Sequence, residues 1–182
     1  MHYIAEAKRK TNVAEYLLYM WQMEDLLRGL DFDFEALETS VLSGIEDEEQ
    51  RRASAIWFAD LIKAMKTQDL KTSGHLGETY DLISELQLLQ HTLSTVIGDV
   101  EFKKILTKVQ PLLAEFRTKT DKIPKSDIET ALTAMYGYLS LKLASKKVSE
   151  ETEAAVKVFG AYLAHLSKAY RDMKSGESPL NN

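Results

Sequence analysis

Residues 12–28 read Asn-Val-Ala-Glu-Tyr-Leu-Leu-Tyr-Met-Trp-Gln-Met-Glu-Asp-Leu-Leu-Arg, and this stretch decides the fold. Six apolar or aromatic residues follow one another over 16–21. A helix with such a run is apolar on every side, so other helices must surround it. Asn12 and Glu15 have the spacing of a capping box at its start, and Gly29 stands where it should end. The stretch therefore predicts the central helix of a helical bundle, which carries Glu15, Gln22 and three aromatic rings into that centre.

Length and composition predict one globular domain. The chain has 182 residues, of which 45% are hydrophobic and 28% charged, with only 8 Gly and 3 Pro. A chain of this length buries a sizeable core without disulfides. The absence of Cys excludes a disulfide framework, a thiolate zinc site and a cysteine nucleophile. Neither a secretory signal nor an apolar stretch near the ~20 residues of a membrane span is present, so we expect a cytoplasmic protein.

Charge is unevenly distributed along the chain. Residues 31–60 hold nine acidic residues and two arginines, whereas residues 100–147 hold ten basic residues and five acidic ones. Such segments form solvated helix faces, steer a charged partner, or face each other within the fold. The chain as a whole carries a net charge of −5, and its lysines lack interleaved aromatic residues. Nucleic-acid binding is therefore disfavoured.

Apolar residues recur at helical spacing along the rest of the chain. Six more helices are expected: 35–43, 47–71, 78–97, one around Pro111, one beginning after Ser126 and one beginning after Ser149. Pro111 should kink or split its helix. Ser126 and Glu129 form a second capping box, and the short link before Ser149 makes the last two helices antiparallel neighbours. We predict an all-α single-domain bundle of about six to seven mostly antiparallel helices over 1–174, with a disordered tail over 175–182.

No residue is predicted to be catalytic, to bind a cofactor or to ligate a metal. Di-metal bundles use a Glu three residues before a His, and no histidine of this chain has an acid there. Phosphate-binding glycine loops and serine-nucleophile motifs are also missing. Glu24 and Arg28 have the spacing of an ion pair on the surface of a helix.

Five residues remain as candidates for a ligand pocket between helices: Glu15, Tyr19, Trp21, Gln22 and His91. Buried Tyr and Trp need hydrogen-bond partners, and Glu15 and Gln22 lie one turn from Tyr19. A small polar or aromatic ligand would suit such a pocket. The alternative is that these residues form a core whose tyrosines reach its rim.

One stretch is similar to a known family. Lys8-Arg-Lys-Thr-Asn-Val-Ala-Glu-Tyr-Leu-Leu-Tyr-Met-Trp-Gln-Met-Glu-Asp-Leu-Leu-Arg28 resembles the opening of an uncharacterised all-helical family of Bacteroidetes, a domain of unknown function. Residues 126–129, Ser-Asp-Ile-Glu, and 134–137, Ala-Met-Tyr-Gly, are similar to it as well. The resemblance implies a small cytoplasmic helical protein and supplies no activity, substrate or cofactor.

Two functions follow from these observations. An apolar-rich helical chain without catalytic spacing favours a non-enzymatic interaction module, which binds a protein partner or forms a homo-oligomer. The alternative is a small-ligand binding protein, or an enzyme of unfamiliar type, with an aromatic and polar pocket between helices.

Overall fold

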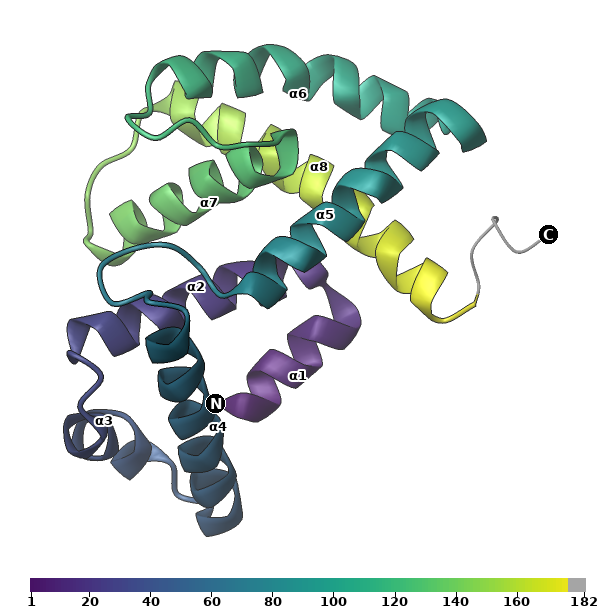
Figure 1. Ribbon diagram of the computed structural model, residues 1–182. Coiled ribbons are helices and arrows are strands. Elements are labelled where there is room, and N and C mark those ends of the chain that lie inside the picture. Colours follow the sequence, from purple (N-terminus) through teal and green to yellow (C-terminus); the bar gives the residue numbers. More distant parts are fainter. Residues whose placement is uncertain (177–182) are drawn as a thin grey trace. The chain divides into compact units, whose positions relative to one another are not determined.

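The computed structural model describes residues 1–176, and within this range the regular secondary structure is entirely helical. Figure 1 shows the eight α-helices of the described residues in chain order. They are α1 (His2–Thr11), α2 (Val13–Gly29), α3 (Phe34–Ser40), α4 (Glu48–Thr67), α5 (Gly77–His91), α6 (Val100–Thr118), α7 (Asp127–Leu143) and α8 (Glu150–Lys174). A short 3-10 helix, η1 (Leu42–Gly44), follows α3, and a π-helix, η2 (Thr92–Ile97), continues α5. The predicted all-α class is confirmed.

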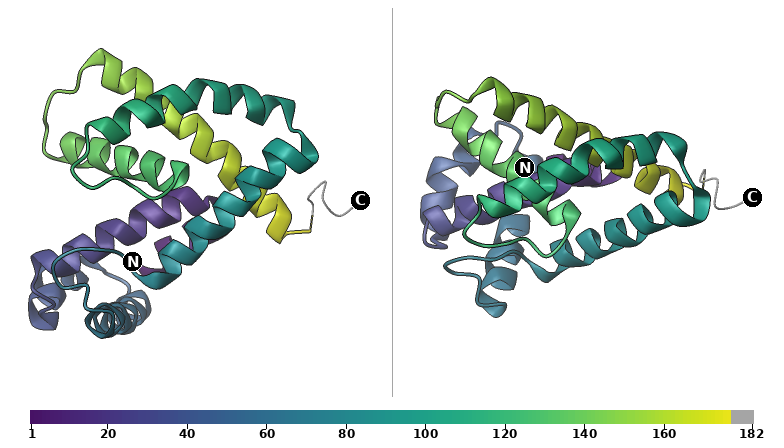
Figure 2. Two further views of the ribbon diagram at one scale, coloured as in Figure 1. Left: turned by 45° about the horizontal axis from the view of Figure 1, so that its top comes forward. Right: turned by 90° about the horizontal axis from the view of Figure 1, so that it is seen from above.

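The chain packs as two compact units. The first unit contains Met1–Lys10 and Glu15–Asp81, and the second contains Thr11–Ala14 and the chain from Leu82 onward. The first unit thus holds α3, α4 and most of α1 and α2. The second holds α6, α7, α8 and most of α5, with α6, α7 and α8 each in contact with the other two (Figure 2).

The apolar girdle of α2 is buried, as its unbroken apolar run predicts. Each residue over 16–21 is at most 9% exposed, and Leu17 is fully buried. Leu27, on the same face, is also fully buried. Glu15 is an exception to the prediction, because its side chain lies at the surface instead of in the centre. Other parts of the chain therefore enclose this turn of α2 on all sides.

Several helices end at left-handed residues that are not glycine. Asp31, Asp69 and Ser145 have φ values of 50°, 55° and 53°. After α4, the Leu70 amide donates to the Met65 carbonyl at 2.9 Å, which is the long hydrogen bond of a Schellman motif. Because Asp69 supplies the left-handed residue there, α4 stops at Thr67, before the predicted end at residue 71.

Helix starts in the second unit follow the sequence more closely. Ser126 accepts the Glu129 amide at 3.1 Å, and Ser149 accepts the Thr152 amide at 3.2 Å, so both predicted N-caps are confirmed. The Glu129 carboxylate accepts the amide of Lys125, one residue before the cap, at 2.7 Å. The chain reverses direction between α7 and α8, as their short link predicts (Figure 1).

Four expectations on element boundaries need correction or qualification. The sequence did not predict α1, and the helix expected over 78–97 changes from α to π at Thr92. Pro111 lies inside α6 without splitting it, although the helix curves visibly in Figure 1. Of the tail predicted over 175–182, all but Ser175 and Gly176 lies outside the described residues.

Candidate functional site

Glu24 is the one buried charged side chain among residues 1–176, with no exposed surface. One carboxylate oxygen lies 2.6 Å from Nδ1 of His75, and the other accepts the Leu76 amide at 3.0 Å. The surface pair predicted between Glu24 and Arg28 is therefore wrong, and Arg28 pairs with Asp25 at 2.6 Å. A buried carboxylate is stable only when hydrogen bonds replace its water, and the loop before α5 supplies them.

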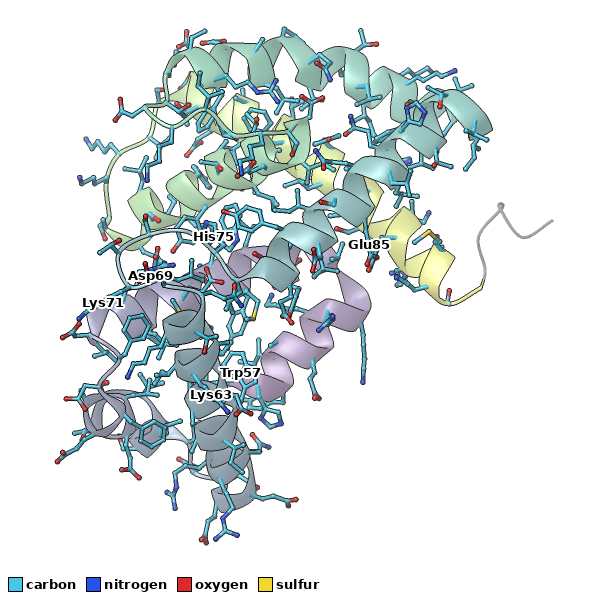
Figure 3. The ribbon with its side chains drawn as sticks, viewed as in Figure 1. Trp57, Lys63, Asp69, Lys71, His75 and Glu85 are labelled. Atoms are coloured by element: carbon cyan, nitrogen blue, oxygen red, sulfur yellow. The ribbon has the colours of Figure 1, made fainter. Side chains whose placement is uncertain are left out.

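His75 lies between this carboxylate and an aromatic ring. Its ring stacks on Trp21 at 4.1 Å between centroids, with 10° between the planes. Its side chain keeps 23% of its surface exposed, and Figure 3 shows it beside the start of α5. A carboxylate at this distance favours a proton on Nδ1 of His75. The arrangement orients an imidazole, and it also anchors the loop.

Arg28 strengthens the anchoring role. Its Nε donates to the Leu70 carbonyl at 3.0 Å, and a terminal nitrogen donates to the Gly74 carbonyl. Two side chains of α2, Glu24 and Arg28, thus bind the backbone of the loop between α4 and α5 at both of its ends. Such hydrogen bonds to charged groups contribute about 1.5–3 kcal/mol each. We therefore assign a structural function to this polar cluster: Glu24 and Arg28 hold the loop on α2.

A cavity of about 340 Å³ lies in the first unit, and we call it the Trp57 cavity. Its wall combines aromatic, aliphatic and charged side chains: Arg9, Tyr16, Met20, Trp57, Asp60, Leu61, Ala64, Gln68, Leu76 and Glu78. Figure 3 shows Trp57 on α4, on the side of α1. The cavity therefore lies among α1, α2, α4 and the start of α5.

A hydrogen bond and a cation–π contact order one wall of the Trp57 cavity. The Tyr16 hydroxyl donates to the Glu78 carboxylate at 2.8 Å, and the Arg9 guanidinium lies 5.3 Å above the centre of the Tyr16 ring. Burial, followed by the hydrogen bond to Glu78, raises the pKa of Tyr16 above its ordinary value. Tyr16 therefore remains a neutral hydrogen-bond donor over the physiological pH range.

A larger apolar groove of about 630 Å³ lies in the second unit, and we call it the α6–α8 groove. It runs between the C-terminal half of α6 and the N-terminal half of α8, with Ala134 of α7 also in its wall. Leu112, Phe116 and Val158 line it and are only half-buried. The Lys119 ammonium and the Glu115 carboxylate pair at 2.6 Å in its wall. The groove thus combines an apolar floor with charged edges.

The second unit also contains a polar network centred on Asp127. This carboxylate accepts Arg117 at 2.7 Å, Gln110 at 2.7 Å and Gln90 at 3.5 Å. Burial works to raise the pKa of Asp127, but these three hydrogen bonds outweigh it and lower the pKa below its ordinary value. Gln90 in turn accepts the hydroxyl of the fully buried Tyr162. Because these donors and acceptors satisfy one another, the network serves packing in the second unit.

A second histidine–carboxylate pair occurs in the same unit. His165 Nε2 lies 3.0 Å from the Asp99 carboxylate, and the His165 ring stacks on Phe102 at 5.1 Å. Asp99 also caps α6 by accepting the Phe102 amide at 2.9 Å. That backbone hydrogen bond is the main reason why the pKa of Asp99 is lowered, and the hydrogen bond with His165 adds to it.

Comparison with known proteins identifies a family. The family model described as Domain of unknown function (DUF4924) matches residues 2–177. The chain belongs to this family. No curated protein and no solved structure matches the chain significantly. Membership of DUF4924 agrees with the resemblance noted in the sequence and brings no activity with it.

None of the five predicted pocket residues of this DUF4924 chain lines the Trp57 cavity or the α6–α8 groove. Tyr19 is buried and donates to the Met1 carbonyl at 3.2 Å, and burial raises its pKa to about 12. Trp21 is covered by His75. Gln22 is half-buried, and Glu15 pairs with Lys8 at 2.6 Å at the surface. His91 is exposed at the end of α5 and belongs to the second unit, unlike the other four.

Sequence reasoning missed Glu24 although a signal was present. Leu17, Met20, Glu24 and Leu27 follow one another at spacings of three and four, so they share one face of α2. The three apolar members are at most 1% exposed. A lone acid on such a face predicts a buried carboxylate with a partner from elsewhere in the chain.

Two further features are absent from residues 1–176. No group of three or more potential metal ligands occurs among them. None of their helices is long and apolar enough to cross a membrane.

Proposed function

We propose that this protein is a non-enzymatic helical module that binds another protein chain, either a partner or a second copy of itself, through the α6–α8 groove. The observation that carries the proposal is the half-buried apolar wall of that groove. Covering such a wall removes apolar surface from water, which contributes about 25 cal/mol per Å². Apolar side chains of a partner helix would fit between α6 and α8.

The charged residues at the edge of the groove favour a protein as its ligand and disfavour a wholly apolar molecule. Lys119, Glu115 and Glu151 surround the apolar floor with charges of both signs. Protein interfaces share this arrangement of an apolar centre and a polar rim. The charged rim would fix the register of a partner helix, while the apolar floor would supply most of the affinity.

Exposed apolar side chains elsewhere in the second unit support self-association. Leu88, Val96 and Val100 are 68%, 72% and 67% exposed. Side chains of this kind are candidates for the surface that a second copy would present. We further propose the cytoplasm as the place of action, because a chain without cysteine needs no oxidising compartment.

A charged residue placed in the groove tests the proposal. Val158→Glu should abolish association, because a carboxylate in the apolar wall cannot be desolvated without a partner. Ile56→Glu, at a 60% exposed apolar position of α4 in the first unit, is the matched control and should associate as the natural chain does. Light scattering after size-exclusion chromatography measures self-association.

A photo-crosslinking residue at position 158 tests whether the groove binds a protein other than a second copy of this chain. It should capture one specific protein, whereas the same residue at position 56 should not. A natural chain that stays monomeric at every concentration and cross-links to nothing through position 158 would contradict the proposal. Retained far-UV circular dichroism shows that each variant is folded.

A further inference from the structure

We propose that the Trp57 cavity binds a small organic cation, an ammonium group on an apolar body, with Asp60 and Glu78 as counter-charges and the Trp57 indole as apolar wall. This site belongs to the first unit and is independent of the α6–α8 groove. The proposal rests on the size of the cavity, the charges of its wall and the presence of an aromatic ring.

The volume and the wall fit a small molecule. Ligand cavities in proteins measure about 300–1,000 Å³, and this one measures about 340 Å³. Met20, Leu61 and Leu76 give it an aliphatic floor, and all three are buried. The Trp57 side chain is half-buried, so part of its surface remains open to the cavity. An apolar body of a few carbon atoms would cover that floor.

The charges of the wall select the sign of the ligand. Asp60 has no ion-pair or hydrogen-bond partner among residues 1–176, and Glu78 accepts only the Tyr16 hydroxyl. A carboxylate offers about four lone-pair positions, so both acids can accept further donors. Arg9 is the single cation of the wall, and one face of its guanidinium lies over Tyr16. Two carboxylates against one guanidinium favour a cation.

An ammonium group satisfies this set of acceptors. It carries three donors for the carboxylates, and the face of an indole attracts cations within about 6 Å of the ring centre. A carboxylate ligand would instead meet the negative charges of Asp60 and Glu78, with Arg9 as its sole counter-charge. A metal ion is disfavoured, because residues 1–176 contain no group of three ligating side chains.

Tryptophan fluorescence gives a direct test on the full chain. The chain has two tryptophans, of which Trp21 is buried under His75 and Trp57 lines the cavity. Titration with phenethylammonium chloride should change the fluorescence to saturation. The matched anion 3-phenylpropionate should bind at least tenfold more weakly. In Trp57→Phe the fluorescence response should disappear, while calorimetry should still detect binding of the amine.

Two variants that each remove one negative charge distinguish an effect of the cavity from an effect of the net charge of the protein. Asp60→Asn should weaken amine binding by roughly tenfold or more, the usual effect of losing one charged partner. Glu38→Gln makes the same change of charge in the first unit, at an exposed residue outside the cavity, and should bind as the natural chain does. Both positions are exposed, so both variants should keep the natural melting temperature.

Three outcomes would overturn the proposal. The first is the absence of saturable binding of the amine. The second is equal binding of the amine and the anion, and the third is unchanged amine binding by Asp60→Asn. None of these outcomes bears on the α6–α8 groove, since the two tests use different residues.

Discussion

The two histidine–carboxylate pairs of this protein use the same groups for different purposes. In the first unit, Glu24 is fully buried and joins His75 to the backbone of the loop before α5. In the second unit, the Asp99 side chain is 25% exposed and caps α6 while it contacts His165. Each histidine stacks on an aromatic ring, with 10° between the planes at Trp21 and 24° at Phe102.

Solvent access of the carboxylate explains the difference. Water can replace a lost partner at Asp99, because part of that side chain reaches solvent. Water cannot do so at Glu24, where the protein alone satisfies the charge. The pair of Glu24 and His75 is therefore a tertiary anchor of the first unit, whereas the pair of Asp99 and His165 adds modestly to a helix cap in the second.

Removal of the buried carboxylate should have the largest effect on stability. Glu24→Ala leaves the buried Leu76 amide and His75 Nδ1 without their acceptor, so it should cost about 3–5 kcal/mol. Glu24→Gln keeps one carbonyl acceptor and should cost less. Urea denaturation followed by circular dichroism measures both values. If Glu24→Ala lowers the free energy of unfolding by less than about 1 kcal/mol, the buried pair is no stronger than the partly exposed pair of Asp99 and His165.

Replacement of each histidine sharpens the comparison. His75→Leu leaves a buried carboxylate with one hydrogen bond fewer and should cost about 2 kcal/mol. His165→Leu should cost under about 1 kcal/mol, because Asp99 still caps α6 and still reaches water. Equal losses in urea denaturation would show that exposure of the carboxylate does not set the strength of these pairs.

The smallest effect concerns pH. Folding lowers the pKa of Asp99 from its ordinary value of 3.8, so Asp99 adds stability above about pH 4. This contribution is lost as the pH falls through the lower pKa of the folded state. Asp99→Asn cannot titrate there, so the stability difference between natural chain and variant should shrink in acid. Thermal melting of both chains from pH 7 to pH 2 measures this stability difference. A difference that stays constant over this range would show that Asp99 does not contribute in this way.

Local signals account for the parts of the fold that the sequence predicted. The run over 16–21 is apolar on every side of its helix, so its burial does not depend on which helices cover it. Ser126 and Ser149 cap their helices through amides three residues away. Nothing distant in the chain is needed for either feature.

The errors have physical causes as well. Ala5 is the only buried residue of α1, so that helix shows no long apolar stripe from which to predict it. Helices also end near Asp31, Asp69 and Ser145, which have a left-handed backbone without being glycine, so no glycine in the sequence marks these ends. The predicted pocket residues share α2 for the most part, but adjacent positions on a helix point in different directions.

The sequence by itself determined that this chain is helical, where most of its helices lie, and that α2 is surrounded. These properties follow from periodicity and from contacts within one turn. Only the tertiary structure decided that the chain packs as two units and that Glu24 meets His75, 51 residues away. It also decided that Trp57, Asp60 and Glu78 share a cavity. Such pairings depend on how helices pack, because a local pattern states which face is buried but not what covers it.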